Sequence, residues 1–255
     1  TGRANVNDLL AVIIGNGTNY GLYGMANISD RAYDQLKGIQ ANYLRPETLN
    51  NANDVINNSV ARLAIFKHYN IQEDLIHASA DGQKFESRLE TFKTRYSSKY
   101  FGTNKGVSAI TLIANHAALN AKVIGSNEHE SHYIFDLLQS NTSEIQPDVL
   151  STDTHGVNHV NFALLDLFGY TFAPRYAQFG KVIEEMFKVS ENKDQGVTLS
   201  LKKPIKTDLI IEHWDTIQRI AISLQEKSTT QAILVRKLSG YSKSHPLLQA
   251  LTEYN

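Results

Sequence analysis

The stretch that decides the fold is Leu75-Ile-His-Ala-Ser-Ala-Asp81-Gly82, a short apolar run that ends at an acidic residue followed by glycine. A run this short, bounded by a turn signal, predicts a buried β-strand over residues 75–80. A second run of the same kind, Asp148-Val-Leu-Ser-Thr-Asp153, follows further along the chain. Each of these two strands is therefore predicted to end at an aspartate.

Three more strands are predicted around this pair, over residues 107–114, 119–124 and 170–173, because β-branched and apolar residues gather there between turn signals. Helical spacing of apolar residues predicts helices over 128–139 and 157–168, the second closed by Gly169. The element order from residue 74 is thus β-β-β-α-β-α-β. The first three strands form a meander, and the later two need helical crossovers that place them parallel to the first. This is the element order of an RNase H-like α/β fold.

Helical patterns flank this region on both sides. Helices are predicted over 8–14, 30–44 and 46–65 before it, and over 208–227, 229–238 and from Pro246 after it. A polar loop is expected over 190–196. We therefore expect three parts: a helical region (1–72), an RNase H-like core carrying both aspartates (73–180) and a mainly helical insertion (181–255).

Composition excludes several classes of protein. The chain has 255 residues with 25 Lys+Arg and 26 Asp+Glu, a formal charge of −1 that rules out a uniformly basic nucleic-acid coat. The absence of cysteine excludes disulfides, thiolate metal sites and cysteine nucleophiles. No apolar run is long enough for a membrane span and no signal peptide opens the chain, so we expect a soluble cytoplasmic protein. The first residue is not Met and the last residues lie in a predicted helix, so we expect a piece of a longer protein.

Asp81 and Asp153 are the candidate site. Functional groups gather at the carboxyl ends of strands in open α/β sheets, so neighbouring strands would bring the two carboxylates together. Paired carboxylates suit Mg²⁺, and two such ions serve in-line phosphoryl transfer. Two other interpretations remain open: Asp81-Gly82 as a simple turn, and Asp153 as a cap of the following helix.

Seven blocks of sequence carry a resemblance to a known family. They are Gly21-Leu-Tyr-Gly-Met-Ala26, Tyr43-Leu-Arg-Pro-Glu-Thr48, Ser79-Ala-Asp-Gly-Gln-Lys-Phe85, Lys99-Tyr-Phe-Gly102 with Gly106-Val107, Ser151-Thr-Asp-Thr-His-Gly156, Phe172-Ala-Pro-Arg175 and His213-Trp-Asp215. In this order they resemble the signature blocks of Tn3-family transposases. Any one block is weak, but seven in register span nearly the whole chain.

The resemblance implies a DDE transposase in which Asp81 and Asp153 are the first two catalytic carboxylates and ligands of Mg²⁺ or Mn²⁺, with two ions in the intact enzyme. It implies strand cleavage and strand transfer at transposon ends in replicative transposition. The implied partners are double-stranded DNA, as terminal inverted repeats and as target, and further copies of the full-length protein, with no membrane. The implied location is the bacterial cytoplasm.

The third carboxylate of the family is a Glu in an Asn-(Lys/Arg)-Gly-Glu-like motif after a helical insertion. No such motif occurs in this chain, so the resemblance places that Glu beyond Asn255. The residues alone would favour Glu184 or Glu185, which follow the fifth strand, but a surface-facing pair explains them equally well. We therefore expect the fragment itself to be inactive.

Basic residues suggest where DNA would bind. Residues 84–105 carry six positive and two negative side chains, and residues 202–243 carry eight and four. Such patches contact phosphates without reading sequence, and interleaved tyrosines could stack on unpaired bases. The candidate DNA-binding residues are Lys84, Arg95, Lys99, Tyr100, Lys105, His155 and Arg175. For the first patch, the alternative is a charged face of a hairpin. For His155, the alternative is a structural role. Residues 128–132 are interpreted as a solvated helix face.

Three functions follow from these residues. The leading hypothesis is the catalytic-core region of a Tn3-family transposase. The second is a DNA-binding and assembly fragment without activity. The third is an unrelated RNase H-like nuclease, against which the helical flanks and the seven blocks count.

Overall fold

A computed structural model of the chain describes residues 3–192, 196–242 and 244–254. These residues fall into two compact units, one within Thr1–Ile56 and the other within Asn57–Asn255. The predicted division at residues 72 and 180 into three domains stays a prediction. No helix in the described ranges is both long enough and apolar enough to cross a membrane.

The first unit is helical, as expected, but its helices differ from the predicted ones. It contains α1 (Val6–Gly17), α2 (Gly21–Ile28), α3 (Tyr33–Tyr43) and the first part of α4 (Pro46–Ala61). Helix α1 was expected to end at Gly15 but continues to Gly17. Gly15 instead allows α2 to pack closely, since a Cβ there would lie 2.7 Å from Cγ of Met25. Helix α2 was not predicted, since its two glycines weaken the helical signal. Ala11, Val12, Met25 and Leu36 form a small core.

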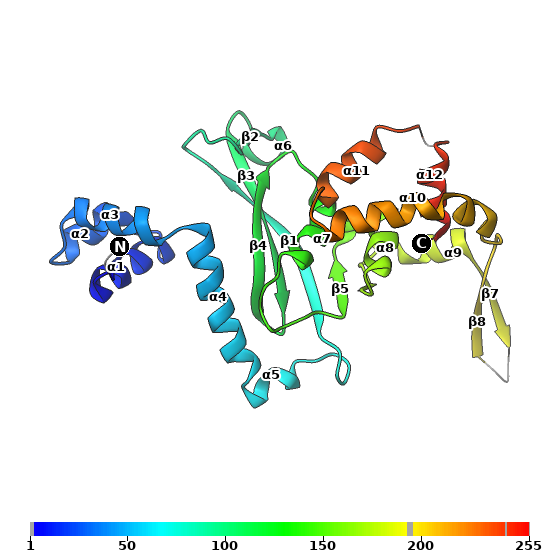
Figure 1. Cartoon of the computed structure of the whole chain (residues 1–255), viewed down its shortest axis with the longest axis horizontal. Coiled ribbons are helices and arrows are strands. Elements are labelled where there is room, and N and C mark those ends of the chain that lie inside the picture. Colours follow the sequence, from blue (N-terminus) through cyan, green and yellow to red (C-terminus); the bar gives the residue numbers. More distant parts are fainter. Residues whose placement is uncertain (1–2, 193–195, 243, 255) are drawn as a thin grey trace. The chain divides into compact units, whose positions relative to one another are not determined.

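The second unit is built on a mixed six-stranded sheet (Figure 1). Its strands are β1 (His77–Glu86), β2 (Arg95–Tyr96), β3 (Lys105–Ala114), β4 (Ala117–Gly125), β5 (Val149–Thr152) and β6 (Thr171–Phe172). Strand β3 pairs antiparallel with β1 on one side and with β2 and β4 on the other. Strand β5 pairs parallel with β1, and β6 parallel with β5. The expected α/β class with a mixed sheet is confirmed.

Strand β1 is longer than predicted and does not stop at Asp81. It pairs with β3 from Ala78 opposite Ala114 to Glu86 opposite Gly106. The interpretation of Asp81-Gly82 as a turn is therefore wrong, because β3 supplies backbone partners on both sides of it. The residues on the two faces differ: Ala78 and Ala80 are buried, whereas Asp81 is exposed. Asp81 thus lies inside a strand, on the side of the sheet that faces away from the core.

Two short helices cover the inner face of the sheet near its centre. The predicted helix over 128–139 is broken at Tyr133 into the 3₁₀ turn η1 (Glu130–His132) and α7 (Ile134–Gln139). Helix α8 (His159–Leu167) ends before Gly169, whose φ of +80° makes it the left-handed cap that the sequence predicts. Buried side chains of both helices join those of β3 in one core that includes Phe135, Leu137 and Leu164.

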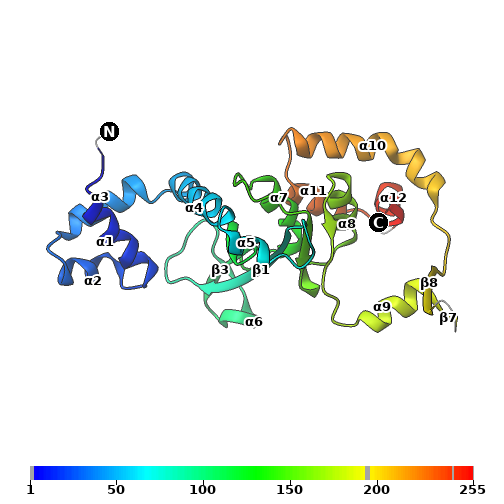
Figure 2. The ribbon, with the colours of Figure 1, turned by 90° about the horizontal axis from the view of Figure 1, so that it is seen from below.

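The last part of the chain adds helices to the same core. Helices α10 (Thr207–Gln225), α11 (Gln231–Ser239) and α12 (Pro246–Tyr254) gather with α8 (Figure 2). Ile217, Leu224 and Leu251 are buried there. Shorter helices along the chain are α5 (Ala64–His68), α6 (Ser98–Phe101) and α9 (Phe179–Met186).

One part of the predicted helical insertion is a β-hairpin. Strands β7 (Phe187–Asn192) and β8 (Gly196–Leu201) pair antiparallel, where a polar loop was expected. Val197, Leu199 and Leu201 alternate with the polar Thr198 and Ser200, a pattern typical of a strand that the sequence analysis missed. Residues 193–195 of the predicted loop lie outside the described residues.

Candidate active site: a carboxylate-lined cleft where β5 ends

The register of two parallel strands brings the two candidate aspartates together. Ser79 pairs with Ser151 and Ala80 with Thr152, so Asp81 and Asp153 come next in register. Strand β5 ends at this point, whereas β1 continues to Glu86. Both aspartates line one cleft of about 560 Å³. The two aspartates thus line the same cleft, but only Asp153 follows the end of a strand, and a shared metal site stays a prediction.

The cleft is lined by residues from four segments: β1, α6, the turn after β4 with η1, and the end of β5. They are Asp81, Gly82, Gln83, Lys84, Lys99, Tyr100, Ser126, Asn127, Glu128, His129, Glu130 and Asp153. Segments more than 70 residues apart in the sequence thus contribute to one surface.

Asp153 is oriented by the turn that follows it. Its Oδ1 accepts a hydrogen bond of 3.2 Å from the backbone N–H of Gly156, and its carbonyl oxygen accepts one of 3.0 Å from the same N–H. The capping interpretation is correct in part, because Asp153 caps the 3₁₀ turn η2 (Thr154–Gly156). The cap of α8 itself is Asn158, which accepts from Val160 N–H. The same carboxylate can therefore serve as a cap and face the cleft.

Glu130 is a residue of the cleft that the sequence analysis missed. Its carboxylate accepts a hydrogen bond of 3.1 Å from Ser108 Oγ and lies 3.9 Å from Lys84 Nζ. Its side chain is only 18% exposed, so the interpretation of residues 128–132 as a solvated helix face is wrong for Glu130. The signal that could have found it is Gly82, an inward-facing glycine in a strand: a Cβ there would lie 2.1 Å from the Cδ of Glu130. The carboxyl group fills the space that a side chain would take.

The charges in the cleft favour a cation. Four residues with carboxylates line the cleft, together with two that carry ammonium groups, Lys84 and Lys99. The two aspartates offer hard oxygen ligands, which suit Mg²⁺ or Mn²⁺ when water and a phosphate complete the coordination. Within the described residues, no group of three or more His, Asp or Glu side chains is close enough to hold a metal ion by itself. The residues present therefore fit a cation site that needs further ligands.

Three of the candidate DNA-binding residues line the cleft, namely Lys84, Lys99 and Tyr100. The ammonium groups of the two lysines lie 4.9 and 5.0 Å from the centre of the Tyr100 ring. Lys84 Nζ also donates to the carbonyl of Ser126 at 3.1 Å. The tyrosine ring is thus held between two cations at the rim of the cleft.

Two other candidates are engaged elsewhere in the fold. The guanidinium of Arg95 donates from Nη1 to the carbonyls of Phe92 and Thr94, both at 2.8 Å, and so holds its own loop. Lys105 forms an ion pair of 2.5 Å with Glu90, and its hydrogen bond with this carboxylate raises the pKa of the Lys105 ammonium. Both residues lie outside the lining of the cleft.

The remaining candidates lie around η2 and α9. The backbone of Arg175 extends the pairing of β5 and β6, since its N–H donates to Thr152 O at 2.8 Å. His155 lies within η2, but its side chain is outside the described residues. Glu184 and Glu185 lie on α9 and are not part of the cleft lining; Glu185 forms an exposed ion pair with Lys181.

The fold and the cleft define an α/β protein that gathers carboxylates beside the end of β5. The chain belongs to the family of the Tn3 transposase DDE domain, whose family model matches residues 1–255. The resemblance carried by the seven sequence blocks is thereby confirmed.

Curated relatives agree with this assignment. The chain is 29% identical over 252 residues to the transposase for transposon Tn3926 of Escherichia coli, with 96% of this chain and 25% of that protein covered. It is 29% identical over 249 residues to the transposase for transposon Tn501 of Pseudomonas aeruginosa, with the same shares covered. The transposase for transposon Tn2501 of Escherichia coli is 32% identical over 257 residues, covering 96% of this chain and 24% of the relative. The chain thus spans about a quarter of the length of the relatives it matches.

One solved structure also overlaps with the chain. It is the piggyBac transposase synaptic complex with hairpin DNA, with 12% identity and a TM-score of 0.37. The overlap covers 99% of this chain and 66% of that one.

Proposed function

We propose that this chain is the catalytic-core region of a DDE transposase that cleaves DNA at transposon ends and joins the freed ends to target DNA. The observation that carries the proposal is the register of β1 and β5, which sets Asp81 and Asp153 side by side on one cleft. The strand order β4-β3-β1-β5-β6, with the last two parallel to β1, supports an RNase H-like fold.

Five residues of the cleft then have a defined part. Asp81 and Asp153 provide oxygen ligands for Mg²⁺ or Mn²⁺, which when bound lowers the barrier to attack on a phosphate by water or a 3′-hydroxyl. The N–H of Gly156 holds Oδ1 of Asp153 in place. Lys84 and Lys99 contact phosphates beside the reacting one, and the exposed ring of Tyr100 stacks on a base at the cleaved end.

The third carboxylate of the intact enzyme is proposed to come from outside these 255 residues. No Asn-(Lys/Arg)-Gly-Glu motif occurs in the chain, and the described part offers no three-carboxylate metal group. Because a second cation needs further hard ligands, the 255-residue chain alone is expected to bind DNA without cleaving it. This is the second candidate function, a DNA-binding and assembly module.

The experiment is strand cleavage of a transposon-end duplex in Mg²⁺ or Mn²⁺ by the intact transposase that contains this chain. Asp81→Asn and Asp153→Asn are each expected to lower the rate by about 10²–10³-fold or more, since each removes a charge that stabilises the transition state. Binding of the duplex should change little. Glu185→Gln is the matched control, because its carboxylate is exposed on α9 and lies outside the cleft.

Two outcomes would contradict the proposal. Cleavage at the parent rate by Asp81→Asn or Asp153→Asn would show that the reaction occurs elsewhere. Robust cleavage by the 255-residue chain alone would show that its own residues complete the site, and Glu130→Gln, Glu184→Gln and Glu185→Gln would then identify which carboxylate does so.

A further inference from the structure

A pair of fully buried amide side chains links the C-terminal helices to the cleft. Gln231 is the first residue of α11 and Asn161 lies on α8, and both are 0% exposed. The Nε2 group of Gln231 donates to Oδ1 of Asn161, and also to the carbonyl of Ser131 at 3.0 Å. Its Oε1 accepts from Phe135 N–H at 2.8 Å. Every polar atom of the Gln231 side chain therefore has a partner.

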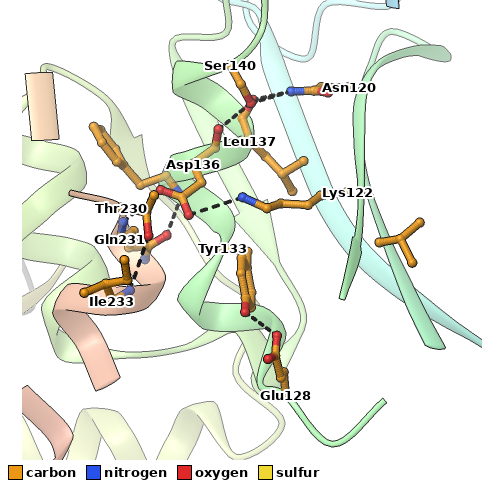
Figure 3. A network of polar contacts seen from close by, with 12 residues as sticks. Asn120, Lys122, Glu128, Tyr133, Asp136, Leu137, Ser140, Thr230, Gln231 and Ile233 are labelled. Atoms are coloured by element: carbon orange, nitrogen blue, oxygen red, sulfur yellow. Dashed lines mark hydrogen bonds and ion pairs between the residues drawn. The ribbon is translucent and has the colours of Figure 1, made fainter. Parts of the chain in front are cut away.

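The start of α11 is anchored at the same place. The backbone N–H of Gln231 donates to Oδ1 of Asp136 at 2.8 Å, and Oδ2 of that aspartate lies 3.5 Å from Lys122 Nζ on β4 (Figure 3). Thr230 caps the helix through its hydroxyl, which accepts from Ile233 N–H. The position of Gln231 is thus fixed from the sheet, from α7 and from its own helix.

From this pair, hydrogen bonds lead to both acidic segments of the cleft. Ser131, whose carbonyl accepts from both amides, directly follows Glu130 in η1. Nδ2 of Asn161 also donates to the carbonyl of Gly156 at 3.2 Å. Gly156 in turn donates its N–H to Oδ1 of Asp153. One residue, Gly156, therefore connects the buried amides to the carboxylate through its N–H and its carbonyl oxygen.

We propose that Gln231 and Asn161 are positioning residues that hold the turns carrying Glu130 and Asp153 in the geometry needed to bind a divalent cation. The proposal rests on the proposed function, since it assumes that Asp81 and Asp153 bind that cation. The proposal gives the segment from α10 to α12 a role in shaping the site, although none of its described residues lines the cleft.

The test uses the 255-residue chain and two measurements. The first variant, Gln231→Met, keeps the side-chain volume and removes every hydrogen bond of the Gln231 side chain. The second variant, Gln231→Glu, keeps only the oxygen that accepts from Phe135 N–H. The first measurement is amide hydrogen exchange, which should become faster at residues 130–135 and 153–157. The second is Mn²⁺ affinity by electron paramagnetic resonance, which should fall about tenfold or more, as for partners that orient metal ligands.

Asn57→Leu is the matched control. Asn57 is 3% exposed and donates to the carbonyl of Ala118 at 2.8 Å, at the opposite end of the β3–β4 hairpin. This variant loses a buried amide of the same kind, so it should destabilise the fold and leave both Mn²⁺ affinity and exchange in the two turns at the parent level.

Each result has a distinct meaning. Parent-level Mn²⁺ affinity in both Gln231 variants, or unchanged exchange in the two turns, would overturn the positioning role. Parent-level affinity in Asp81→Asn and Asp153→Asn would overturn the proposed function instead. Loss of affinity in the Gln231 variants, with Asn57→Leu unaffected, would support both.

Discussion

At the scale of single residues, Gly156 leaves no room for a side chain. A Cβ at this position would lie 2.4 Å from both Cβ and Oγ1 of Thr152, which is 4% exposed. Because Thr is β-branched, its side chain is stiff and cannot rotate aside without leaving its preferred rotamer. The turn after β5 can therefore follow its course only with glycine at this point.

Gly156→Ala is accordingly expected to lower the free energy of unfolding by about 1–3 kcal/mol through overpacking. Urea unfolding followed by circular dichroism measures this change. Gly180→Ala is the control, because nothing lies within 4 Å of a Cβ there and the residue is in α9; it should be neutral or slightly stabilising. Equal stability of Gly156→Ala and the parent would mean that the turn relaxes freely.

His132 gives the fold a dependence on acid pH. Burial lowers the pKa of its imidazole, and the nearby charges of His129 and Arg236 lower it further against an opposing effect of Glu128. In the unfolded chain His132 takes up a proton below about pH 6.5, whereas in the folded chain it does so only at a lower pH. The stability contributed by neutral His132 is complete above about pH 6.5 and is lost as the pH falls.

His132→Gln should therefore reduce the difference between the free energies of unfolding measured at pH 7.5 and at pH 5.5. Urea titrations of the parent and the variant at both pH values give the comparison. A variant that loses as much stability on acidification as the parent does would assign the acid sensitivity to other groups.

At the scale of elements, the β3–β4 hairpin depends on two residues in the left-handed region. Asn115 and His116 have φ of +46° and +66°, which fits the tight two-residue turn that matches strand twist. Asn115 also donates from Nδ2 to the carbonyl of Phe66 at 3.0 Å and to Oδ1 of Asn70 at 2.7 Å. The turn therefore fixes the hairpin and joins it to α5.

Two substitutions separate these effects. Asn115→Gly loses the hydrogen bonds and keeps the backbone conformation, whereas Asn115→Ala loses both, so the alanine variant should be less stable by about 1 kcal/mol. Thermal or urea unfolding of the two variants gives the difference directly. An alanine variant as stable as the glycine variant would indicate that the turn changes its type.

At the scale of the whole molecule, the positively charged side chains of residues 84–105 are less available to DNA than their number suggests. Of the six positive side chains in residues 84–105, four already contact carbonyls or carboxylates of the chain: Lys84, Lys93, Arg95 and Lys105. Lys99 instead lies at the rim of the cleft over an aromatic ring. The second basic segment is not part of the cleft.

Duplex binding is therefore expected to weaken steeply with salt, and Lys99→Glu should lower affinity more than Lys105→Glu, whose ammonium is paired with Glu90. Both effects should be alike for all DNA sequences, because phosphate contacts carry no sequence information. Fluorescence anisotropy between 50 and 200 mM salt measures both effects. Over this range of salt, the DNA affinity of a strong binder falls about a thousandfold. Affinity independent of salt would exclude the electrostatic account.

Much of the core could be predicted from the sequence, and the reasons differ by residue. The β-branched run over 107–114 and the apolar runs ending at Asp81 and Asp153 gave the central strands and the two aspartates. The continuation of β1 to Glu86 was not predictable, because polar residues there become a strand only through pairing with β3. Glu130 was missed for a similar reason: its burial depends on Gly82, which lies 48 positions earlier in the sequence.

The pairing of β1 with β5 also determines when the site can form during folding. Strands β3 and β4 are joined by a two-residue turn and can pair early, whereas Ser79 and Ser151 meet only after the 71 residues between them have been arranged. Pairing over such a sequence separation is slower than hairpin formation, so we expect the two carboxylates to come together after the β3–β4 hairpin has formed. A nascent or partly unfolded chain thus holds its aspartates apart, and the nuclease chemistry proposed here is confined to molecules whose sheet is complete.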